Sequence, residues 1–391
     1  NMKGNPMDFI ESTSSHHLKF GLARMHYEKG ERRDFLPDFV MRLAHSGADI
    51  LIEEGYGSEM GYSEQDYLQA AGQVHVVAQD EVFQRDYVLV LRCPKETQIQ
   101  KMKPGACLIS MLHYPTRPKR VELLQTLGLE AVSLDSIKDD TGRRLVENLR
   151  AVGWNGVEAA FDILARIYPE PGFESSERPP IHVTLLGAGA VGIQVVQAAS
   201  RYGNTARHRR CAERGIPGVQ VTTLEYDSTR HPHIMRPILE TTDILIDATQ
   251  RPDPTQPVIP NAWVAWLPSH AVLLDLSVDP YDCSVDPPYV KGIEGIPQGD
   301  LDQYIFEPDD PIYDRMPVCF DTSYRRHAVS CYSWPGIYPN ACMEVYGKQI
   351  LPILRVILER GGIQKVRPNG QYFERTISRA RLAPMDLIFH P

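Results

Sequence analysis

The sequence lacks any long apolar run and any concentration of charge of one sign. No stretch of its 391 residues approaches the ~18 apolar residues of a transmembrane helix. The net charge of −9 disfavours binding to nucleic acid or to an anionic membrane. The first residues carry no apolar core of a signal peptide. We therefore expect a soluble, cytoplasmic protein without nucleic-acid or membrane partners.

Several catalytic and metal-binding patterns are also missing. The sequence has no GxSxG, and no Ser-His-Asp order stands out, which argues against a serine hydrolase. None of its seven cysteines forms CxxC, so a zinc ribbon or a thioredoxin-type redox pair is not expected. The cysteines are Cys93, Cys107, Cys211, Cys283, Cys319, Cys331 and Cys342. An odd count without clustered spacing predicts reduced cysteines and no metal site.

What is present is a globular composition, 42% hydrophobic and 23% charged, in a chain long enough for two domains. Over the first ~140 residues, candidate strands alternate with helical spacers, which indicates a parallel α/β sheet. These strands are LKFGLA, ADILIEEGYG, VHVVA, YVLVLRCP, ACLISMLH and LEAVSLD. The segment SEQDYLQAAG predicts a short helix capped by Ser63. This half has no glycine-rich turn of its own.

Two long helical segments flank the second half. RRLVENLRAVGWNGVEAAFDILARIY, residues 143–168, has helical spacing and predicts a linking helix. NACMEVYGKQILPILRVILERG, after Pro339, predicts a second helix that returns the chain to the first domain, with Pro352 near its middle. Between them lie the strands VQVTTLEYD, DILIDATQ and AVLLDLSVD. We predict one domain from residues 1–143 plus 341–391 and a second from 144–340.

A glycine-rich turn opens the second domain. Gly187, Gly189 and Gly192 form G-x-G-x-x-G after the apolar run VTLL and before IQVVQAA. In a strand–turn–helix context the first glycine permits a tight turn, the second lets a pyrophosphate approach, and the third allows close helix packing. The predicted dinucleotide site also includes Ala190, Val191, Ala248 and Thr249.

An acidic residue that binds the cofactor ribose is expected about 20 residues after this turn. Here Glu225 lies 33 residues beyond Gly192, with Asp227 close by, because NTARHRRCAERGIPG lengthens the connection. Either carboxylate favours NAD over NADP, since it accepts a hydrogen bond from a ribose 2′-OH and repels the negative charge of a 2′-phosphate. The longer connection also carries Arg207, Arg209 and Arg210. These are candidate phosphate ligands or, more commonly, a solvated helix end.

At this point the chain resembles the alanine dehydrogenase and pyridine nucleotide transhydrogenase family, with lysine-forming saccharopine dehydrogenases as relatives. The resemblance covers roughly residues 18–360 and is carried by the stretches EKGERRDFLP, GADILIEEGYGSEMGYSEQDYLQAAG, ACLISMLHYP, LLDLSVDP and YSWPGIYP. It implies two Rossmann-like, doubly wound parallel-sheet domains, with a cleft between them and two long joining helices. The first domain would then hold substrate, and the protein would form a homo-oligomer, a dimer or larger.

The resemblance also implies roles for single residues. It places Arg32 at the position that binds the substrate carboxylate, His113 at the catalytic histidine and Asp279 at the aspartate facing the nicotinamide. His113 is a suitable proton acceptor because the ordinary pKa of histidine, about 6.5, is near working pH. Ser333 and Trp334 occupy the loop beside the substrate, where alanine dehydrogenases have an Asn-Met pair.

Arg92 departs from the family pattern. Leu91-Arg92-Cys93-Pro94 stands where the family has V-K-E-P, so Arg92 replaces a lysine that contacts substrate. A guanidinium stays protonated at any working pH, so Arg92 can hold a carboxylate but cannot act as a base. We expect Arg92 to bind substrate and His113 to transfer the proton.

The leading hypothesis is an NAD(P)-dependent oxidoreductase, with NAD the more favoured cofactor, that acts on the CH–NH or CH–NH2 group of an amino acid and forms a 2-oxo acid. An opine- or saccharopine-type dehydrogenase, which joins an amino acid to a 2-oxo acid, is an alternative within enzymes. A non-catalytic nucleotide-binding sensor or subunit is the alternative of another class.

Overall fold

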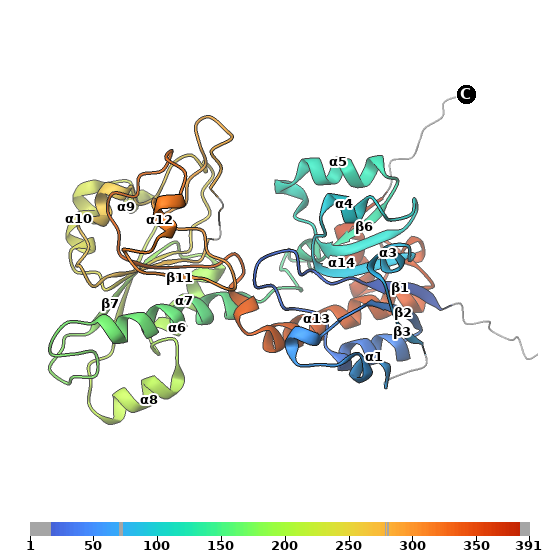
Figure 1. The fold of residues 1–391 in the computed structure, drawn as a ribbon, viewed down its shortest axis with the longest axis horizontal. Coiled ribbons are helices and arrows are strands. Elements are labelled where there is room, and N and C mark those ends of the chain that lie inside the picture. The colour runs from blue at the N-terminus through green and yellow to red at the C-terminus, as the bar shows by residue number, and fades with distance from the viewer. Residues whose placement is uncertain (1–16, 70–72, 278, 280, 384–391) are drawn as a thin grey trace, which may run out of the picture. The chain divides into compact units, whose positions relative to one another are not determined.

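The computed structural model describes residues 17–69, 73–277, 279 and 281–383, and these divide into two compact units. Unit 1 comprises described residues 17–25, 32–147 and 343–383, and unit 2 comprises 26–31 and 148–342. The boundaries predicted at 143/144 and 340/341 lie a few residues before these divisions. Residues 26–31 join unit 2, which the sequence pattern did not indicate. Figure 1 shows the elements of each unit.

Unit 1 is built on a seven-stranded sheet in its described part, with the strand order β13-β6-β5-β4-β1-β2-β3. Its strands are β1 (Leu18–Leu22), β2 (Ala48–Glu53), β3 (Val74–Val77), β4 (Tyr87–Arg92), β5 (Cys107–Met111), β6 (Glu130–Ser133) and β13 (Arg381–Leu382). All neighbours pair in parallel except β13, which lies antiparallel to β6. The first six strands follow the 3-2-1-4-5-6 order of a doubly wound fold.

Helices cover both faces of this sheet, so its central strands are apolar along their length. In β4, Tyr87 to Leu91 are all buried, as expected for a parallel strand with helices on both sides. The α-helices of unit 1 are α1 (Pro37–His45), α2 (Glu64–Leu68), α3 (Gln79–Phe83), α4 (Glu96–Ile99), α5 (Pro118–Thr126), α14 (Tyr372–Ala380) and most of α13 (Pro339–Arg360). Short 3₁₀ turns are η1 (Ser58–Met60), η2 (Tyr114–Thr116), η3 (Leu134–Ser136) and η5 (Ile363–Lys365).

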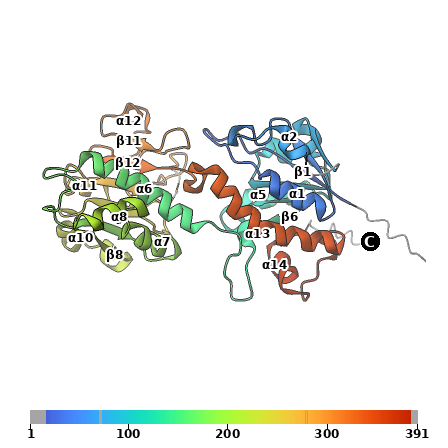
Figure 2. The ribbon, with the colours of Figure 1, turned by 90° about the horizontal axis from the view of Figure 1, so that it is seen from below.

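Local signals in the sequence set two of these helices. Ser63 caps α2 through a capping box in which its hydroxyl accepts from the Asp66 amide while the Asp66 carboxylate accepts from the Ser63 amide. The long helix α13 passes through Pro352 without ending, and its Gly347 packs against the Phe39 ring of α1. Figure 2 shows α13 and α1 next to each other within unit 1.

Unit 2 holds a six-stranded sheet in its described part, ordered β11-β12-β10-β9-β7-β8. Its strands are β7 (Ile181–Leu186), β8 (Val219–Leu224), β9 (Ile244–Asp247), β10 (Val272–Asp275), β11 (Ile305–Phe306) and β12 (His327–Ser330). The strands from β12 to β8 pair in parallel, and β11 lies antiparallel to β12. Two mostly parallel sheets with helices on both sides confirm the predicted α/β class with two Rossmann-like units.

The helices of unit 2 enclose its sheet. They are α6 (Leu149–Ile167), α7 (Ala190–Ala199), α8 (Thr205–Glu213), α9 (Tyr226–Thr229), α10 (Pro232–Leu239), α11 (Asn261–Val264) and α12 (Ile312–Arg315), with the 3₁₀ turn η4 (Trp334–Ile337). Helix α6 packs along α7 and lies over β10 and β12 (Figures 1 and 2). The core between these elements includes Phe161, Leu185 and Trp334, each without exposed surface.

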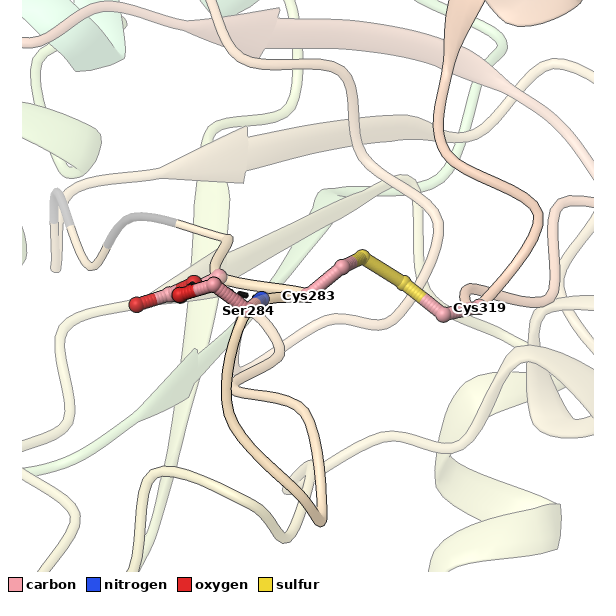
Figure 3. The surroundings of a disulfide bond; sticks show 4 residues. Cys283, Ser284 and Cys319 are labelled. Atoms are coloured by element: carbon pink, nitrogen blue, oxygen red, sulfur yellow. Dashed lines mark hydrogen bonds between the residues drawn. A yellow bond between two sulfur atoms is a disulfide. The ribbon is translucent and has the colours of Figure 1, made fainter.

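One expectation about the cysteines is wrong. Cys283 and Cys319 are joined by a disulfide bond between two surface loops of unit 2 (Figure 3). No local spacing pattern marks this pair, because the two residues lie 36 positions apart and meet only in the folded unit. The other five cysteines are buried and form no disulfide bond within the described residues.

Candidate functional site

The glycine turn of unit 2 brings β7, α7 and the Ala248 backbone close together. Gly187 has φ of +94°, and a Cβ placed there would lie 2.8 Å from the Ala248 carbonyl oxygen. A Cβ on Gly192 would lie 2.5 Å from the Gly187 carbonyl oxygen. A side chain at either position would collide with backbone, so β7, the turn and α7 approach closely only because both residues are glycine.

Gly189 differs from these two because its Cβ position opens onto empty space. It forms the N-cap of α7 without any side-chain cap, and Ala190 at the start of the helix is exposed. Val191 is half-buried and packs on the core. The first amide groups of α7 therefore face an open approach at the positive end of the helix dipole, where an anionic group binds favourably.

Glu225 lies beside this turn. It follows β8, and its Oε1 accepts a hydrogen bond of 2.6 Å from the Ala188 amide inside the glycine turn. Asp227 lies two residues further on, exposed in the first turn of α9. Of the two acids singled out in the sequence, Glu225 is the one in contact with the turn.

Two of the three arginines in the longer β7–β8 connection form ion pairs with neighbouring segments. The connection forms α8, whose N-cap Asn204 accepts from the Arg207 amide. Arg207 pairs with Asp162 of α6, and Arg210 pairs with Glu174. Arg209 is exposed on the same helix. The ion pairs fasten α8 to its neighbours, so Arg207 and Arg210 are already engaged by carboxylates.

The ends of β9 and β10 carry a buried pair of aspartates that the sequence analysis missed. Asp247 Oδ1 accepts from the Thr249 amide and hydroxyl at 3.0 and 2.6 Å, which shapes the turn that holds Ala248 and Thr249. Asp247 Oδ2 is buried without a hydrogen-bond partner among the described residues. Burial, reinforced by the charge of Asp275, raises the pKa of Asp247 to about 6.

Lys291 neutralises the second aspartate. Its Nζ lies 2.7 Å from Asp275 Oδ2 and also donates to the Asp279 carbonyl oxygen at 2.8 Å. Although burial opposes ionisation of Asp275, the neighbouring Lys291 keeps the pKa of this carboxyl below its ordinary value. Lys291 thus connects the end of β10 to the backbone of the following loop.

Asp279 itself is held by an arginine. The Arg251 guanidinium lies 3.1 Å from Asp279 Oδ2 and donates to the Val290 carbonyl oxygen. The Asp279 side chain remains 41% exposed, so its carboxylate is fixed at one end while still reaching the surface. Neither Arg251 nor Lys291 belongs to a motif, and both were found only through their contacts with this loop.

Ser333 and Trp334 occupy different environments. Ser333 is half-buried at the N-cap of η4. Trp334 has no exposed surface: its indole N–H donates to the Asp275 carbonyl oxygen at 2.9 Å, and the Asn155 side-chain amide of α6 donates to the Trp334 carbonyl oxygen. The Trp334 ring packs against α6 and β10 over its whole surface. It leaves no exposed side-chain atoms for the substrate contact that the sequence predicted.

In unit 1, His113 follows β5 with an unusual backbone. Its φ of +51° is a left-handed conformation, which costs about 1–3 kcal/mol for a residue with a side chain and tends to occur at functional sites. Asp135, at the end of the neighbouring β6, holds it: Oδ1 accepts from the Leu112 and His113 amides at 3.0 and 3.1 Å. Asp135 Oδ2 lies 3.5 Å from His113 Nδ1.

These surroundings set the protonation of His113. Burial lowers its pKa; Asp135 opposes this effect, and Arg120, Arg144 and Arg117 add to the lowering. The imidazole is therefore neutral near pH 7 and able to accept a proton. Asp135 was missed in the sequence, although its place as the last residue of LEAVSLD, the strand stretch that follows the one leading to His113, is a signal that could have found it.

Arg92 ends β4, next to the strand that leads to His113. The register between β4 and β5 shifts between Leu89 and Arg92, and Arg92 comes opposite Met111. Such an irregularity re-aims the side chains at the end of a strand. Arg32 is exposed in the loop before α1. The structure thus places Arg92, His113 and Asp135 at the carboxyl ends of three adjacent parallel strands, where doubly wound sheets bind ligands.

Within the described residues, no helix is long and apolar enough to cross a membrane. In the same part of the chain, no group of three or more His, Cys, Asp or Glu side chains is arranged to hold a metal ion.

Comparison with known proteins supports the resemblance found in the motifs. Residues 26–150 match the family model described as alanine dehydrogenase/PNT, N-terminal domain. The chain is 21% identical over 369 residues to alanine dehydrogenase 2 of Staphylococcus aureus, with 90% of each chain covered. It is 22% identical over 194 residues to the NAD(P) transhydrogenase subunit alpha of Haemophilus influenzae, which covers 49% of this chain but only 38% of that subunit.

Solved structures share the fold. An L-alanine dehydrogenase superimposes with a TM-score of 0.67 at 18% identity and covers 96% of this chain and 97% of its own. A transhydrogenase from Sinorhizobium meliloti superimposes with a TM-score of 0.64 at 15% identity, covering 94% and 99%. The predicted resemblance to the alanine dehydrogenase and transhydrogenase family and the predicted two-unit α/β fold are confirmed.

Proposed function

We propose that the protein is an NAD-dependent oxidoreductase that acts on the CH–NH or CH–NH2 group of an amino acid and forms a 2-oxo acid. The observation that carries the proposal is His113, which is held in a left-handed backbone conformation by Asp135 at the carboxyl end of β5 and is kept neutral. A neutral, strand-end imidazole beside an arginine is suited to proton transfer on an anionic substrate. The similarity to alanine dehydrogenases adds support at the level of the whole chain.

The residues of unit 2 fit an NAD cofactor. Gly187 and Gly192 make the tight turn, the open side of Gly189 and the exposed start of α7 receive the pyrophosphate, and Glu225 accepts from a ribose hydroxyl. The Ala248–Thr249 turn lies against Gly187 and forms the adjoining wall. When bound, the nicotinamide supplies the hydride acceptor that no side chain provides.

The other assigned residues act on substrate. His113 Nε2 or Nδ1 takes the proton released when the C–N bond is oxidised and returns it in the reverse reaction. Arg92 and Arg32 hold the substrate carboxylate through forked hydrogen bonds, and Ser333 offers a hydroxyl. Asp279, fixed by Arg251, orients water or polar substrate atoms. Trp334 does not touch substrate in this proposal; its buried ring anchors the loop that carries Ser333 to the end of β10.

The proposal is tested by measuring NADH oxidation by the purified protein with ammonium and a panel of 2-oxo acids. We expect turnover that requires both the oxo acid and ammonium, and NAD reduction with the matching amino acid. Turnover that requires a second amino acid in place of ammonium would establish the opine- or saccharopine-type alternative. Tight NADH binding without turnover of any pair would instead identify a non-catalytic nucleotide-binding protein.

The proposal includes a homo-oligomer in the cytoplasm. Ile193 and Val196 are 58% and 40% exposed and lie one turn apart on α7. Exposed apolar side chains in such a row are typical of subunit contacts. A monomer by light scattering at micromolar concentration would contradict this part of the proposal.

A further inference from the structure

The disulfide between Cys283 and Cys319 is open to reagents in solution. Both residues are exposed in surface loops of unit 2, and Val318, beside Cys319, is fully exposed. The five cysteines outside this pair are buried. Thiol–disulfide exchange requires that an attacking thiolate reach a sulfur atom. Access therefore favours exchange at this pair over reaction at the buried cysteines.

The bond is attached to a hairpin of unit 2. We define residues 281–291 as the Asp282 hairpin, because the backbones of Asp282 and Tyr289 pair across it through hydrogen bonds of 3.1 and 2.9 Å. Cys283 lies just inside this pairing (Figure 3). In the part of the chain that the structure describes, positions 283–288 make no backbone–backbone hydrogen bond. The tip of the hairpin therefore depends strongly on the disulfide for its restraint.

Other contacts hold the base of the hairpin. The Tyr281 ring packs on that of Phe320, the residue after Cys319, with the ring centroids 4.0 Å apart. Lys291, at the other end of the hairpin, forms its buried ion pair with Asp275. Neither contact involves the sulfur atoms, so both should survive reduction. Opening the disulfide should loosen the tip of the hairpin without unfolding unit 2.

The hairpin also fixes Asp279, which lies directly before it. Arg251 Nη2 lies 3.1 Å from Asp279 Oδ2, and the same nitrogen donates to the Val290 carbonyl oxygen at 2.6 Å. Val290 belongs to the hairpin, as does Lys291, which donates to the Asp279 carbonyl oxygen at 2.8 Å. A movement of the hairpin therefore reaches Asp279 through both its side chain and its backbone.

We propose that the Cys283–Cys319 pair is a thiol–disulfide exchange site, through which a soluble dithiol reductant loosens the Asp282 hairpin and shifts Asp279. The exchange is independent of the proposed function, whereas the consequence for Asp279 rests on it, because Asp279 belongs to the same site. In the cytoplasm proposed for this protein, a disulfide is usually transient and redox-sensing, and exposed disulfides are the ones that reductants open.

The exchange balances atoms and electrons. One thiolate of the reductant attacks the sulfur of Cys283 or Cys319, the sulfur–sulfur bond breaks, and the other cysteine leaves as a thiolate and takes up a proton. The second thiol of the reductant then displaces the cysteine to which the reductant is bound, and the reductant becomes a disulfide. Two electrons and two protons pass from the dithiol to the protein, and the oxidised reductant reverses the reaction.

Dithiothreitol, a dithiol, tests the exchange in the folded full chain. Under native conditions it should open the pair, so that alkylation and mass spectrometry label Cys283 and Cys319 while the five buried cysteines stay unlabelled. Oxidised dithiothreitol in excess should restore the bond. Opening that requires urea, or labelling of the buried cysteines at the same rate, would overturn the exchange site.

Hydrogen exchange tests the effect on the hairpin. Reduction should make the amides of Asp282 and Tyr289 exchange about tenfold faster and leave β9 and β10 protected. The double variant Cys283→Ser/Cys319→Ser should exchange fast with and without dithiothreitol. Cys211→Ser is the matched control, because Cys211 is a buried cysteine of α8, and this variant should respond like the wild type. Equal exchange of the hairpin before and after reduction would overturn the coupling.

Kinetics test the consequence for the candidate site. Under the turnover conditions of the proposed function, reduction should raise KM for the oxo acid several-fold and change kcat less, as expected for loss of positioning. The double serine variant should show the raised KM in either redox state. Unchanged KM in a fully reduced, active enzyme would overturn the link to Asp279. Alkylation and hydrogen exchange that respond to dithiothreitol in a protein without turnover would support the exchange site and reject the oxidoreductase.

Discussion

The ammonium group of Lys291 lies 2.7 Å from Asp275 Oδ2, and the two side chains are only 1% and 3% exposed. This ion pair closes the carboxyl end of β10 beneath the loop that carries Asp279. Removing one member of such a buried pair leaves the other charged without compensation. The pair is therefore a structural support for the loop and a sensitive point for the stability of unit 2.

Lys291→Met should destabilise the protein by about 3–5 kcal/mol, because the buried Asp275 carboxylate loses its ammonium counter-charge beside Asp247. Lys348→Met is the control, since the Lys348–Glu344 pair on α13 is 74% and 61% exposed and such pairs contribute at most about 1 kcal/mol. Urea unfolding followed by circular dichroism measures both. Similar losses in the two variants would show that the Lys291 pair is not buried as described.

Asp247 should make stability fall as pH rises. Burial raises its pKa to about 6, above the value of about 3.9 in an unfolded chain, so the folded protein binds this proton more tightly. The contribution is full below about pH 4 and is lost as pH rises through 6. Unfolding free energies of the wild type and Asp247→Asn, measured from pH 5 to 7.5, should diverge in slope. Parallel slopes would mean that Asp247 does not titrate in this window.

Gly189→Val should abolish dinucleotide binding without unfolding unit 2. Its Cβ meets only open space, so the side chain fits the protein but occupies the room proposed for the pyrophosphate. NADH fluorescence titration should show at least a hundredfold weaker binding, while the melting temperature changes little. Gly192→Val is the contrast, because its side chain would strike the Gly187 carbonyl and should lower stability as well.

Glu225 should determine the choice between NAD and NADP. Its carboxylate beside Ala188 would repel a 2′-phosphate, so we expect NAD to bind at least tenfold more tightly. Glu225→Gln keeps a hydrogen-bond acceptor for the Ala188 amide while removing the negative charge. The variant should therefore show a smaller preference for NAD over NADP. A wild-type preference for NADPH would contradict the assignment of Glu225 and turn attention to Arg209, whose neighbours Arg207 and Arg210 are already paired.

His113→Ala should lower kcat by about 10² or more, the usual scale for a general acid–base residue. Arg92→Ala should chiefly raise KM, because a guanidinium binds carboxylate but cannot take up a proton.

In the wild type, burial lowers the pKa of His113, so amino-acid oxidation should lose its active base only below pH 6.5. Asp135→Asn should shift this loss of activity to still lower pH, because the Asp135 carboxylate favours the protonated imidazole and its removal lowers the pKa of His113 further. Near-normal kcat in His113→Ala would show that the histidine is structural.

The disulfide between Cys283 and Cys319 should be present in purified protein and open to reductants, because both residues are exposed. Mass spectrometry of alkylated protein should find two fewer free thiols before treatment with dithiothreitol than after it. Replacing both residues with serine should cost about 2–4 kcal/mol, since the bond closes a long loop of the unfolded chain. Dithiothreitol should then have no further effect on stability. Seven free thiols in untreated protein would contradict the pairing.

The sequence by itself determined the features that depend on neighbours along the chain. The turn at Gly187 and Gly192, the capping box at Ser63 and the strand of Tyr87–Arg92 each arise from a few consecutive residues whose backbone needs or periodicity are local. Motif order was enough to predict the two-unit α/β fold, because strand–helix alternation leaves few ways to build a parallel sheet.

Only the tertiary structure decided which distant residues meet. Asp135 reaches His113 because β6 lies beside β5, and β13 pairs with β6 across most of the length of the chain. Lys291 forms an ion pair with Asp275, Cys283 forms a disulfide with Cys319, and Trp334 is buried in the core. No local sequence pattern encodes these contacts. Protonation and charge balance around His113 and Asp247 follow from burial, which a chain acquires only when its segments pack together.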